Sequence, residues 1–301
     1  MTDIAAVTVG GPDMPSPDTL ATASTRRRGT LGVGGWLSAI WLIVITAGAV
    51  LAPWLPIDEP RITDFTVPNN SPIGQAGHLL GTDQNGFDIF SRLIWGGRVS
   101  LIVAVGVLAI GMVVGGGIGL LAGFWRGRLE VLLMAIVDIF LAFPALILLI
   151  AIVAFLGADL TNVVMGISLV SIPAFARIAR ATTLTFSQRE FVLAARAAGA
   201  TNRRIILREI LPNVLLPLLA FGLLVVGIAI VAEGSLAFLG LTSQETISWG
   251  GMINGGRPAL QRENIAHTAM LPALMMFLTV LAVNLLGDRF RAAFDVKDAA
   301  L

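Results

Sequence analysis

The stretch EFVLAARAAGATNRRIILREILPN, residues 190–213, is a long polar interruption between two hydrophobic blocks. From Arg189 to Ala198 the chain uses alanine, leucine, arginine and glutamate, which have high helix propensity. Gly199 is expected to end this helix, because a glycine commonly follows the last helical turn. A second basic helix is expected over residues 202–209. The pattern therefore predicts a helix–turn–helix between two apolar segments.

The composition of the whole chain is that of an integral membrane protein. Of 301 residues, 56% are hydrophobic and only 13% are charged, and the mean hydropathy is +0.86. A soluble domain has about 25% charged residues and about 45–50% apolar ones.

Six segments come close to the length of about 20 apolar residues that a membrane-spanning helix requires. They are Trp36–Leu55, Val99–Gly123, Val131–Phe155, Leu160–Ala176, Val214–Ala232 and Ala269–Gly287. The fourth is the shortest, and polar residues and a proline interrupt it. The predicted fold is an all-α integral membrane protein with six transmembrane helices.

Basic residues set the orientation, because loops rich in lysine and arginine stay in the cytoplasm. With the N-terminus inside, 15 of the 20 basic residues lie in cytoplasmic segments, and seven of these lie between Arg177 and Arg208. Omitting the fourth span would place residues 190–213 outside. We therefore predict a multi-pass protein of the cell (inner, or plasma) membrane, with both termini and this helix–turn–helix on the cytoplasmic side.

Four regions follow from these spans. Residues 1–35 are rich in proline, serine and threonine and are expected to form a disordered cytoplasmic tail. Residues 36–98 hold the first span and an outer segment, residues 99–290 form the transmembrane core, and residues 291–301 form a cytoplasmic C-terminal tail. A second long outer segment, residues 233–268, is also expected to be structured, with a short helix.

Several kinds of chemistry are excluded or disfavoured. The chain has no cysteine, and His78 and His267 lack the spacing of a metal site. The net charge of +1 argues against a nucleic-acid partner. Because no GxxxxGK[ST] motif is present, the chain has no P-loop to hold ATP. We therefore expect no metal, no cofactor and no catalytic residues.

Four glycines recur at every fourth position of the second span. They are Gly111, Gly115, Gly119 and Gly123. This spacing puts them on one helix face, where the absence of side chains lets another helix approach closely. Ordinary helix packing is the favoured role, and a packed helix that slides or tilts during transport is the alternative.

Two acidic residues lie in or beside the spans. Asp138 in the third span is expected to pair with Arg126 or Arg128, in preference to a role in proton coupling. Glu233, at the outer end of the fifth span, is expected to be structural rather than to line a vestibule. Prolines are expected to kink the spans at four positions, namely Pro144, Pro173, Pro217 and Pro272.

The alanines of the inner helix leave two possibilities open. Ala194, Ala195 and Ala198 have small side chains, which would let the helix enter a groove on a partner protein. Alternatively, the helix lies at the membrane surface and is held there by anionic lipid.

The sequence LAARAAGA…ILPN resembles the EAA signature of ABC importer permeases. Leu193, Ala194 and Ala195 stand in the places of Glu-Ala-Ala, Gly199 matches the signature glycine, and Leu211–Pro212 match its end. The chain departs from the family pattern at Leu193, where glutamate is usual.

Four further blocks resemble the dipeptide/oligopeptide/nickel branch of these permeases, and within it the second-permease (C-type) subunit. They lie at residues 78–101, 138–150, 236–253 and 278–295, and together with the inner loop they cover most of residues 78–295.

The resemblance implies a set of partners. A homologous second permease would complete the pathway, two ATP-binding cassette subunits would each receive a coupling helix, and an extracytoplasmic binding protein would deliver dipeptides or oligopeptides. The resemblance places the coupling helix at Arg189, Leu193, Ala194, Ala195, Ala198 and Gly199. A permease for nickel or another small solute is the alternative, followed by an ion-coupled secondary transporter.

Overall fold

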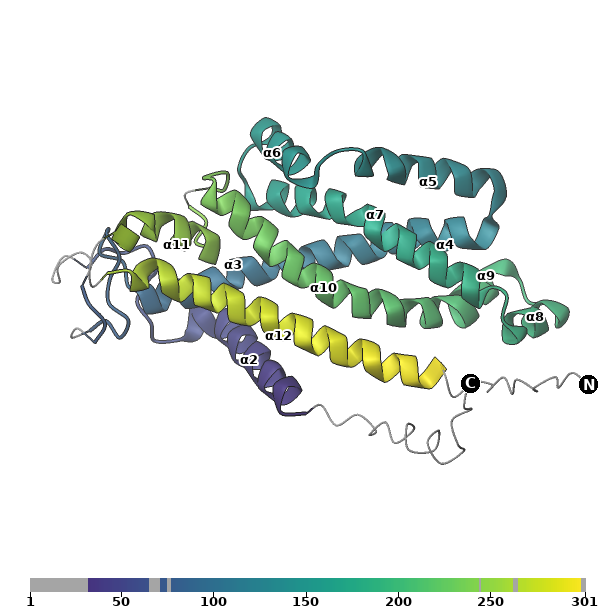
Figure 1. Cartoon of the computed structure of the whole chain (residues 1–301), viewed down its shortest axis with the longest axis horizontal. Coiled ribbons are helices and arrows are strands. Elements are labelled where there is room, and N and C mark those ends of the chain that lie inside the picture. Colours follow the sequence, from purple (N-terminus) through teal and green to yellow (C-terminus); the bar gives the residue numbers. More distant parts are fainter. Residues whose placement is uncertain (1–31, 65–70, 75–76, 244, 262–264, 299–301) are drawn as a thin grey trace, which may run out of the picture.

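The computed structural model describes residues 32–64, 71–74, 77–243, 245–261 and 265–298, and most of these residues are helical (Figure 1). The helices are α2 (Gly32–Leu51), α3 (Ile89–Ile110), α4 (Gly116–Trp125), α5 (Gly127–Leu141), α6 (Ala145–Leu156), α7 (Leu160–Phe186), α8 (Glu190–Ala197), α9 (Asn202–Arg204), α10 (Leu211–Phe238), α11 (Trp249–Gly256) and α12 (His267–Asp298).

The predicted all-α membrane fold is confirmed. Five helical stretches are long and apolar enough to span a bilayer, and a bent pair of helices makes a sixth candidate. Short π-helical turns at Gly111–Gly115 and Ile205–Ile210 join α3 to α4 and α9 to α10, so each pair forms one stretch of 37 residues.

The third span differs from the prediction of one helix over Val131–Phe155. The chain bends by 84° between α5 and α6. Pro144 lies at the bend because it has no N–H group for a helical hydrogen bond and its ring clashes with the preceding turn. Proline also disfavours helical geometry in the residue before it, here Phe143.

The fourth and fifth spans are longer than predicted. α7 extends ten residues beyond Ala176, to Phe186, and continues through Pro173. The separate basic helix predicted over residues 202–209 is instead continuous with the fifth span. A π-helical turn over Ile205–Ile210 makes this connection, and Pro212 follows it in the first turn of α10.

The predicted ends of the membrane core also shift. α2 begins at Gly32, four residues inside the predicted tail, and α12 continues past residue 290 to Asp298. The rest of the N-terminal tail, residues 1–31, lies outside the described residues, so the division into four regions remains a prediction.

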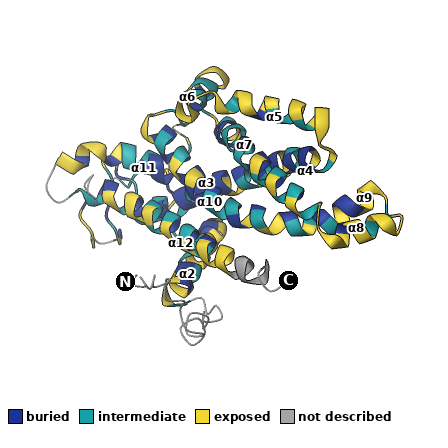
Figure 2. Cartoon of the chain, turned by 45° about the vertical axis from the view of Figure 1, so that its right-hand side comes forward, coloured by how far each residue is buried: buried dark blue, intermediate teal, exposed yellow. Residues whose placement is uncertain are grey.

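The centre of the bundle is the crossing of α3–α4, α7 and α10, where the buried residues gather (Figure 2). The glycine face of the second span lies directly on α7. A Cβ atom at Gly119 would lie 2.2 Å from the carbonyl oxygen of Ala176, and one at Gly115 would lie 2.6 Å from that of Ile172. A Cβ at Gly111 would strike the ring of Phe175 and one at Gly123 the side chain of Thr183. Any larger residue on this face would force the two helices apart.

Candidate functional site

The α8–α9 hairpin lies at one end of the long axis of the bundle, and α11 lies at the opposite end (Figure 1). With the orientation that the arginines predict, the hairpin is at the cytoplasmic end and α11 is at the outer end. The helices between them carry the apolar spans.

The backbone of the hairpin is closed by a glycine turn. Gly199 has φ +80°, a conformation that glycine adopts without steric cost. The N–H of Gly199 donates to the carbonyl of Arg196 at 2.9 Å, and the N–H of Ala200 donates to that of Ala195 at 3.0 Å. These two bonds form a Schellman motif, so Gly199 ends α8 as the sequence predicts.

One side of α8 is anchored and the other is exposed. Val192 is fully buried in the same apolar cluster as Ile205, Ile206 and Ile210 of the following turn. The other candidate coupling residues face outward, apart from the half-buried Ala195. The exposed ones are Arg189, Leu193, Ala194, Ala198 and Gly199. The exposed face of α8 and α9 is visible at the end of the bundle in Figure 2. The hairpin thus offers an exposed surface on a fixed base, with alanines among leucine, phenylalanine and arginine side chains.

A second contact ties the hairpin to the spans. The guanidinium of Arg196 lies over the ring of Phe124, 5.6 Å from its centroid. Phe124 lies in the last turn of α4, just before the turn into α5 at Arg126. A displacement of α8 would therefore reach α4 directly as well as α10.

Asp138 does not pair with Arg126 or Arg128 as predicted. Its Oδ1 accepts a hydrogen bond from Nη2 of Arg177 on α7 at 2.8 Å. Arg126 and Arg128 lie at the start of α5, about 15–18 Å away along the helix axis at 1.5 Å per residue. Because α5 runs beside α7, the nearer guanidinium comes from the neighbouring helix. A second pair links the same helices, since Arg180 Nε donates to Glu130 at 2.7 Å.

Glu233 lies inside the protein at the outer end of α10. It is 1% exposed and accepts a hydrogen bond from Ser100 of α3 at 3.1 Å. The adjacent Gly234 packs against α11, because a Cβ at Gly250 would lie 2.5 Å from its Cα. Nε1 of Trp249 also donates to the carbonyl of Leu93 at 2.9 Å. Glu233 therefore belongs to the packed joint between α3, α10 and α11.

The outer segment before α3 holds a polar cluster around His78, whose sequence spacing disfavours a metal site and predicts no other role. Nδ1 of His78 lies 3.0 Å from Asp88 and Nε2 lies 3.1 Å from Asp64. Burial lowers the pKa of His78, but the hydrogen bonds and negative charges of Asp88 and Asp64 outweigh it, so the net pKa is raised above 6.5. Asp88 also caps α3 by accepting from the N–H of Ser91. No local spacing predicts this cluster, since its members are 10 and 14 residues apart.

The same cluster is the candidate metal group among the described residues. Ligand atoms of Asp58, His78 and Asp88 lie within 4.8 Å of one another. However, both ring nitrogens of His78 face carboxylate oxygens. This is the arrangement of a doubly protonated imidazolium, which has no free lone pair for a metal. We therefore interpret the cluster as a set of ion pairs that fixes the outer segment to α3.

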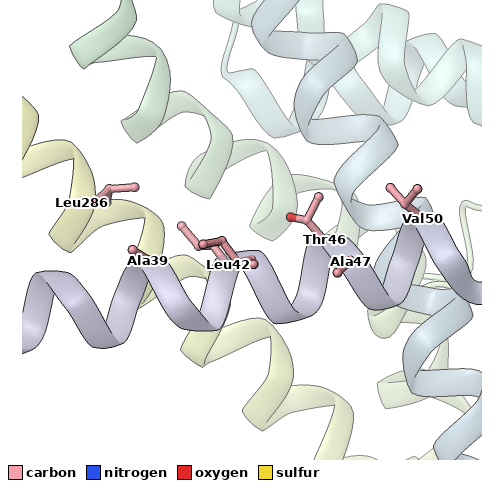
Figure 3. A pocket seen from close by; sticks show the side chains of 7 residues that line it. Ala39, Leu42, Thr46, Ala47, Val50 and Leu286 are labelled. Carbon is pink, nitrogen blue, oxygen red and sulfur yellow. The ribbon is translucent and has the colours of Figure 1, made fainter.

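An apolar groove of about 640 Å³ lies between α2 and α12 (Figure 3). Its lining comes from Ala39, Leu42, Ile43, Thr46, Ala47, Val50 and Leu286. With a single hydroxyl among aliphatic side chains, this groove suits hydrocarbon and offers no group for chemistry.

Comparison with known families and proteins places the chain among transport components. The family described as binding-protein-dependent transport system inner membrane component matches residues 115–297. The glutathione transport system permease protein GsiD of Pectobacterium atrosepticum is 39% identical over 263 residues, covering 86% of each chain. GsiD of Escherichia coli O6:K15:H31 is 42% identical over 263 residues, covering 86% of this chain and 85% of the relative.

Solved structures show the same fold. An inward-facing structure of the MetNI methionine ABC transporter has a chain that aligns with a TM-score of 0.57 at 21% identity, covering 68% of this chain and 97% of that one. A second inward-facing crystal form of that transporter aligns with a TM-score of 0.56 at 22% identity.

Proposed function

Because this chain belongs to the binding-protein-dependent inner membrane components, as a non-catalytic permease subunit of an ABC importer that works with ATPase partners, we propose that it forms half of a pathway for short peptides. A homologous second permease would supply the other half. The identity of about 40% with permeases named for glutathione transport, over 86% of the chain, carries this proposal.

Within that assembly, α8 is proposed as the coupling helix. It lies at the arginine-rich end of the bundle, its small side chains are exposed, and Val192 and Arg196 fix it to α10 and α4. A helix held in this way transmits force to two spans when an ATPase subunit moves it, which suits rigid-body switching between two states. The competing role, a helix held only by anionic lipid, requires no specific fit on its exposed face.

The outer end is proposed as the surface that meets the binding protein. α11 and the segment around His78 are structured, and both are fixed to α3 by buried contacts. The loop from Gly240 into α11 borders this surface. Deleting Gly240 to Gly251 is expected to weaken docking of the binding protein, measured at equal amounts of folded transporter because the deletion also removes the buried Trp249.

The substrate class is tested by reconstitution. The complete transporter, with its second permease, ATPase subunits and binding protein, is placed in proteoliposomes, and uptake of labelled glutathione, a dipeptide and Ni²⁺ is measured with ATP inside. We expect ATP-dependent uptake of glutathione or the dipeptide. Uptake of Ni²⁺ alone would contradict the peptide proposal and support the nickel alternative. Uptake driven by an ion gradient without ATP would contradict the importer mechanism.

A further inference from the structure

One face of α7 continues from an apolar groove to an exposed ion pair. The groove holds about 500 Å³ and lies among α6, α7, α10 and α12. α7 contributes Ile167, Val170, Ser171 and Ala174 to it. Residues three and four apart share a helix face, so Arg177 extends this face by one further turn beyond Ala174.

The ion pair at the end of this face is exposed within the span. The side chains of Asp138 and Arg177 are each 57% accessible to solvent in the isolated chain. Arg177 lies nine residues before the inner end of α7 at Phe186, which corresponds to about 14 Å of helix. Asp138 lies eleven residues after the inner end of α5, about 16 Å along that helix. Arg177, which the predicted end of the fourth span at Ala176 placed in the cytoplasmic loop, therefore lies inside the longer candidate span Leu160–Phe186, and Asp138 lies inside the bent pair α5–α6.

Hydrocarbon would not tolerate this arrangement. Charged side chains inside a membrane span face a protein interior or a water-filled cavity. The lipid core can neither solvate an ion nor hydrogen-bond to polar atoms that point away from the ion pair. The pair is not enclosed by this chain. Its exposed side must therefore meet water, or polar groups of another subunit, in the working protein.

We propose that this face of α7, from the groove at Ile167 to the Asp138–Arg177 pair, is the wall that this subunit contributes to the transport passage. The apolar groove forms the outer part of the wall. The ion pair lies in a water-filled inner vestibule that is open in one of the two transport states and through which a solvated, charged solute passes. The inference rests on the proposed function, since it assumes a second permease opposite this face.

The absence of cysteine makes the inference directly testable. Ala174→Cys and Ala181→Cys place single thiols one turn either side of Arg177 on the same face. Val113→Cys is the matched control, because Val113 is exposed, lies twelve residues from the inner end of α4 and is two positions away from the glycines that face α7. Only the thiolate reacts, and an apolar environment suppresses its formation.

The complete transporter carrying each variant is labelled with a charged, membrane-impermeant methanethiosulfonate reagent in open membranes, with the cysteine-free parent chain as blank. We expect Ala174→Cys and Ala181→Cys to react about tenfold or more faster than Val113→Cys. Trapping the ATPase subunits with ATP and vanadate should slow the reaction at Ala181→Cys, because the inner vestibule closes.

Uptake by each variant is measured first, which separates the two proposals. The inference would be overturned if transporters that import substrate had thiols at positions 174 and 181 that react as slowly as the thiol at position 113. The proposed permease function would then remain intact. A parent transporter that imports no peptide would instead contradict the proposed function. If Ala174→Cys is inactive, Ala181→Cys decides against Leu121→Cys, because Ala181 is exposed, lines no part of the groove and lies five residues from the inner end of α7. Leu121 is likewise exposed and lies four residues from the inner end of α4, two positions from Gly119 and Gly123.

Discussion

The two ends of the molecule are built in different ways. At the inner end, α8 buries one residue, Val192, and exposes most of its remaining surface. At the outer end, α11 buries Trp249, Gly250, Met252 and Gly256 against α3, α10 and α12. The inner end thus exposes side chains that a partner protein can contact, whereas the structure of the outer end depends on close packing between helices of this chain. Substitutions should therefore impair coupling at the inner end and folding at the outer end.

The largest expected effect is on coupling. Ala194→Arg places a long charged side chain on the exposed face of α8 without touching its anchor. We expect substrate-stimulated ATP hydrolysis by the complete transporter to fall by about tenfold or more, equivalent to about 1.4 kcal/mol or more of lost interaction. Membrane abundance should not change, because Ala194 is exposed.

Val33→Arg is the control, since Val33 is exposed at the inner end of α2 and lies outside the hairpin. Equal stimulation in both variants would show that α8 makes no specific contact. Gly199→Trp and Ala195→Arg should reduce stimulation further, but both also disturb the hairpin itself, so Ala194→Arg is the cleaner measurement.

The next effect is on folding at the outer end. Gly250→Ala adds a Cβ 2.5 Å from the Cα of Gly234, which α11 and α10 can relieve only by separating. We expect a loss of about 1–3 kcal/mol of stability, measured as a lower midpoint of thermal unfolding in detergent. Gly255→Ala on the same helix meets nothing within 4 Å and should leave the midpoint unchanged or slightly raised. Similar midpoints for both variants would show that α11 is not closely packed.

A smaller effect should depend on pH. The folded pKa of His78 is raised, so its ion pairs stabilise the protein fully below the unfolded value of 6.5, and this stabilisation is lost as pH rises through the folded pKa. Between pH 6 and a pH above the folded pKa, the thermal midpoint of the parent should therefore fall by more than that of His78→Gln. Asp58, Asp64 and Asp88 face the ring from its own segment. A parent and variant with parallel pH profiles would contradict the ion-pair interpretation.

The smallest expected effect tests the one departure from the family pattern. Leu193→Glu restores the usual glutamate on the exposed face of α8, within reach of Arg196 one turn later. Such a pair stabilises an exposed helix by about 0.2–0.5 kcal/mol. Transport should change by less than about twofold, which the uptake assay measures. A large gain in transport rate would show that the ATPase partner contacts the side chain at this position directly.

Local features of the fold were predictable from the sequence, and contacts between distant segments were not. The apolar runs, the end of α8 at Gly199 and the face of four glycines all depend on neighbouring residues, so their spacing predicts them. Pro144 marked a kink, but the 84° bend depends on how α6 packs against α7, which no local pattern reveals. Likewise, Asp138 pairs with Arg177, 39 residues away, rather than with the arginines nearer in sequence.

The unbroken helical stretch from Asn202 to Phe238 has a mechanical consequence. At 1.5 Å per residue its 37 residues extend about 55 Å, and about 48 Å of this length separates Asn202 in the hairpin from Gly234 beneath α11. The interval between these points is helical throughout, with a π-helical turn at Ile205–Ile210 and Pro217 inside α10. Tilting this helical stretch at the hairpin would therefore shift α11 in the same movement, so one continuous element links the two ends of the molecule.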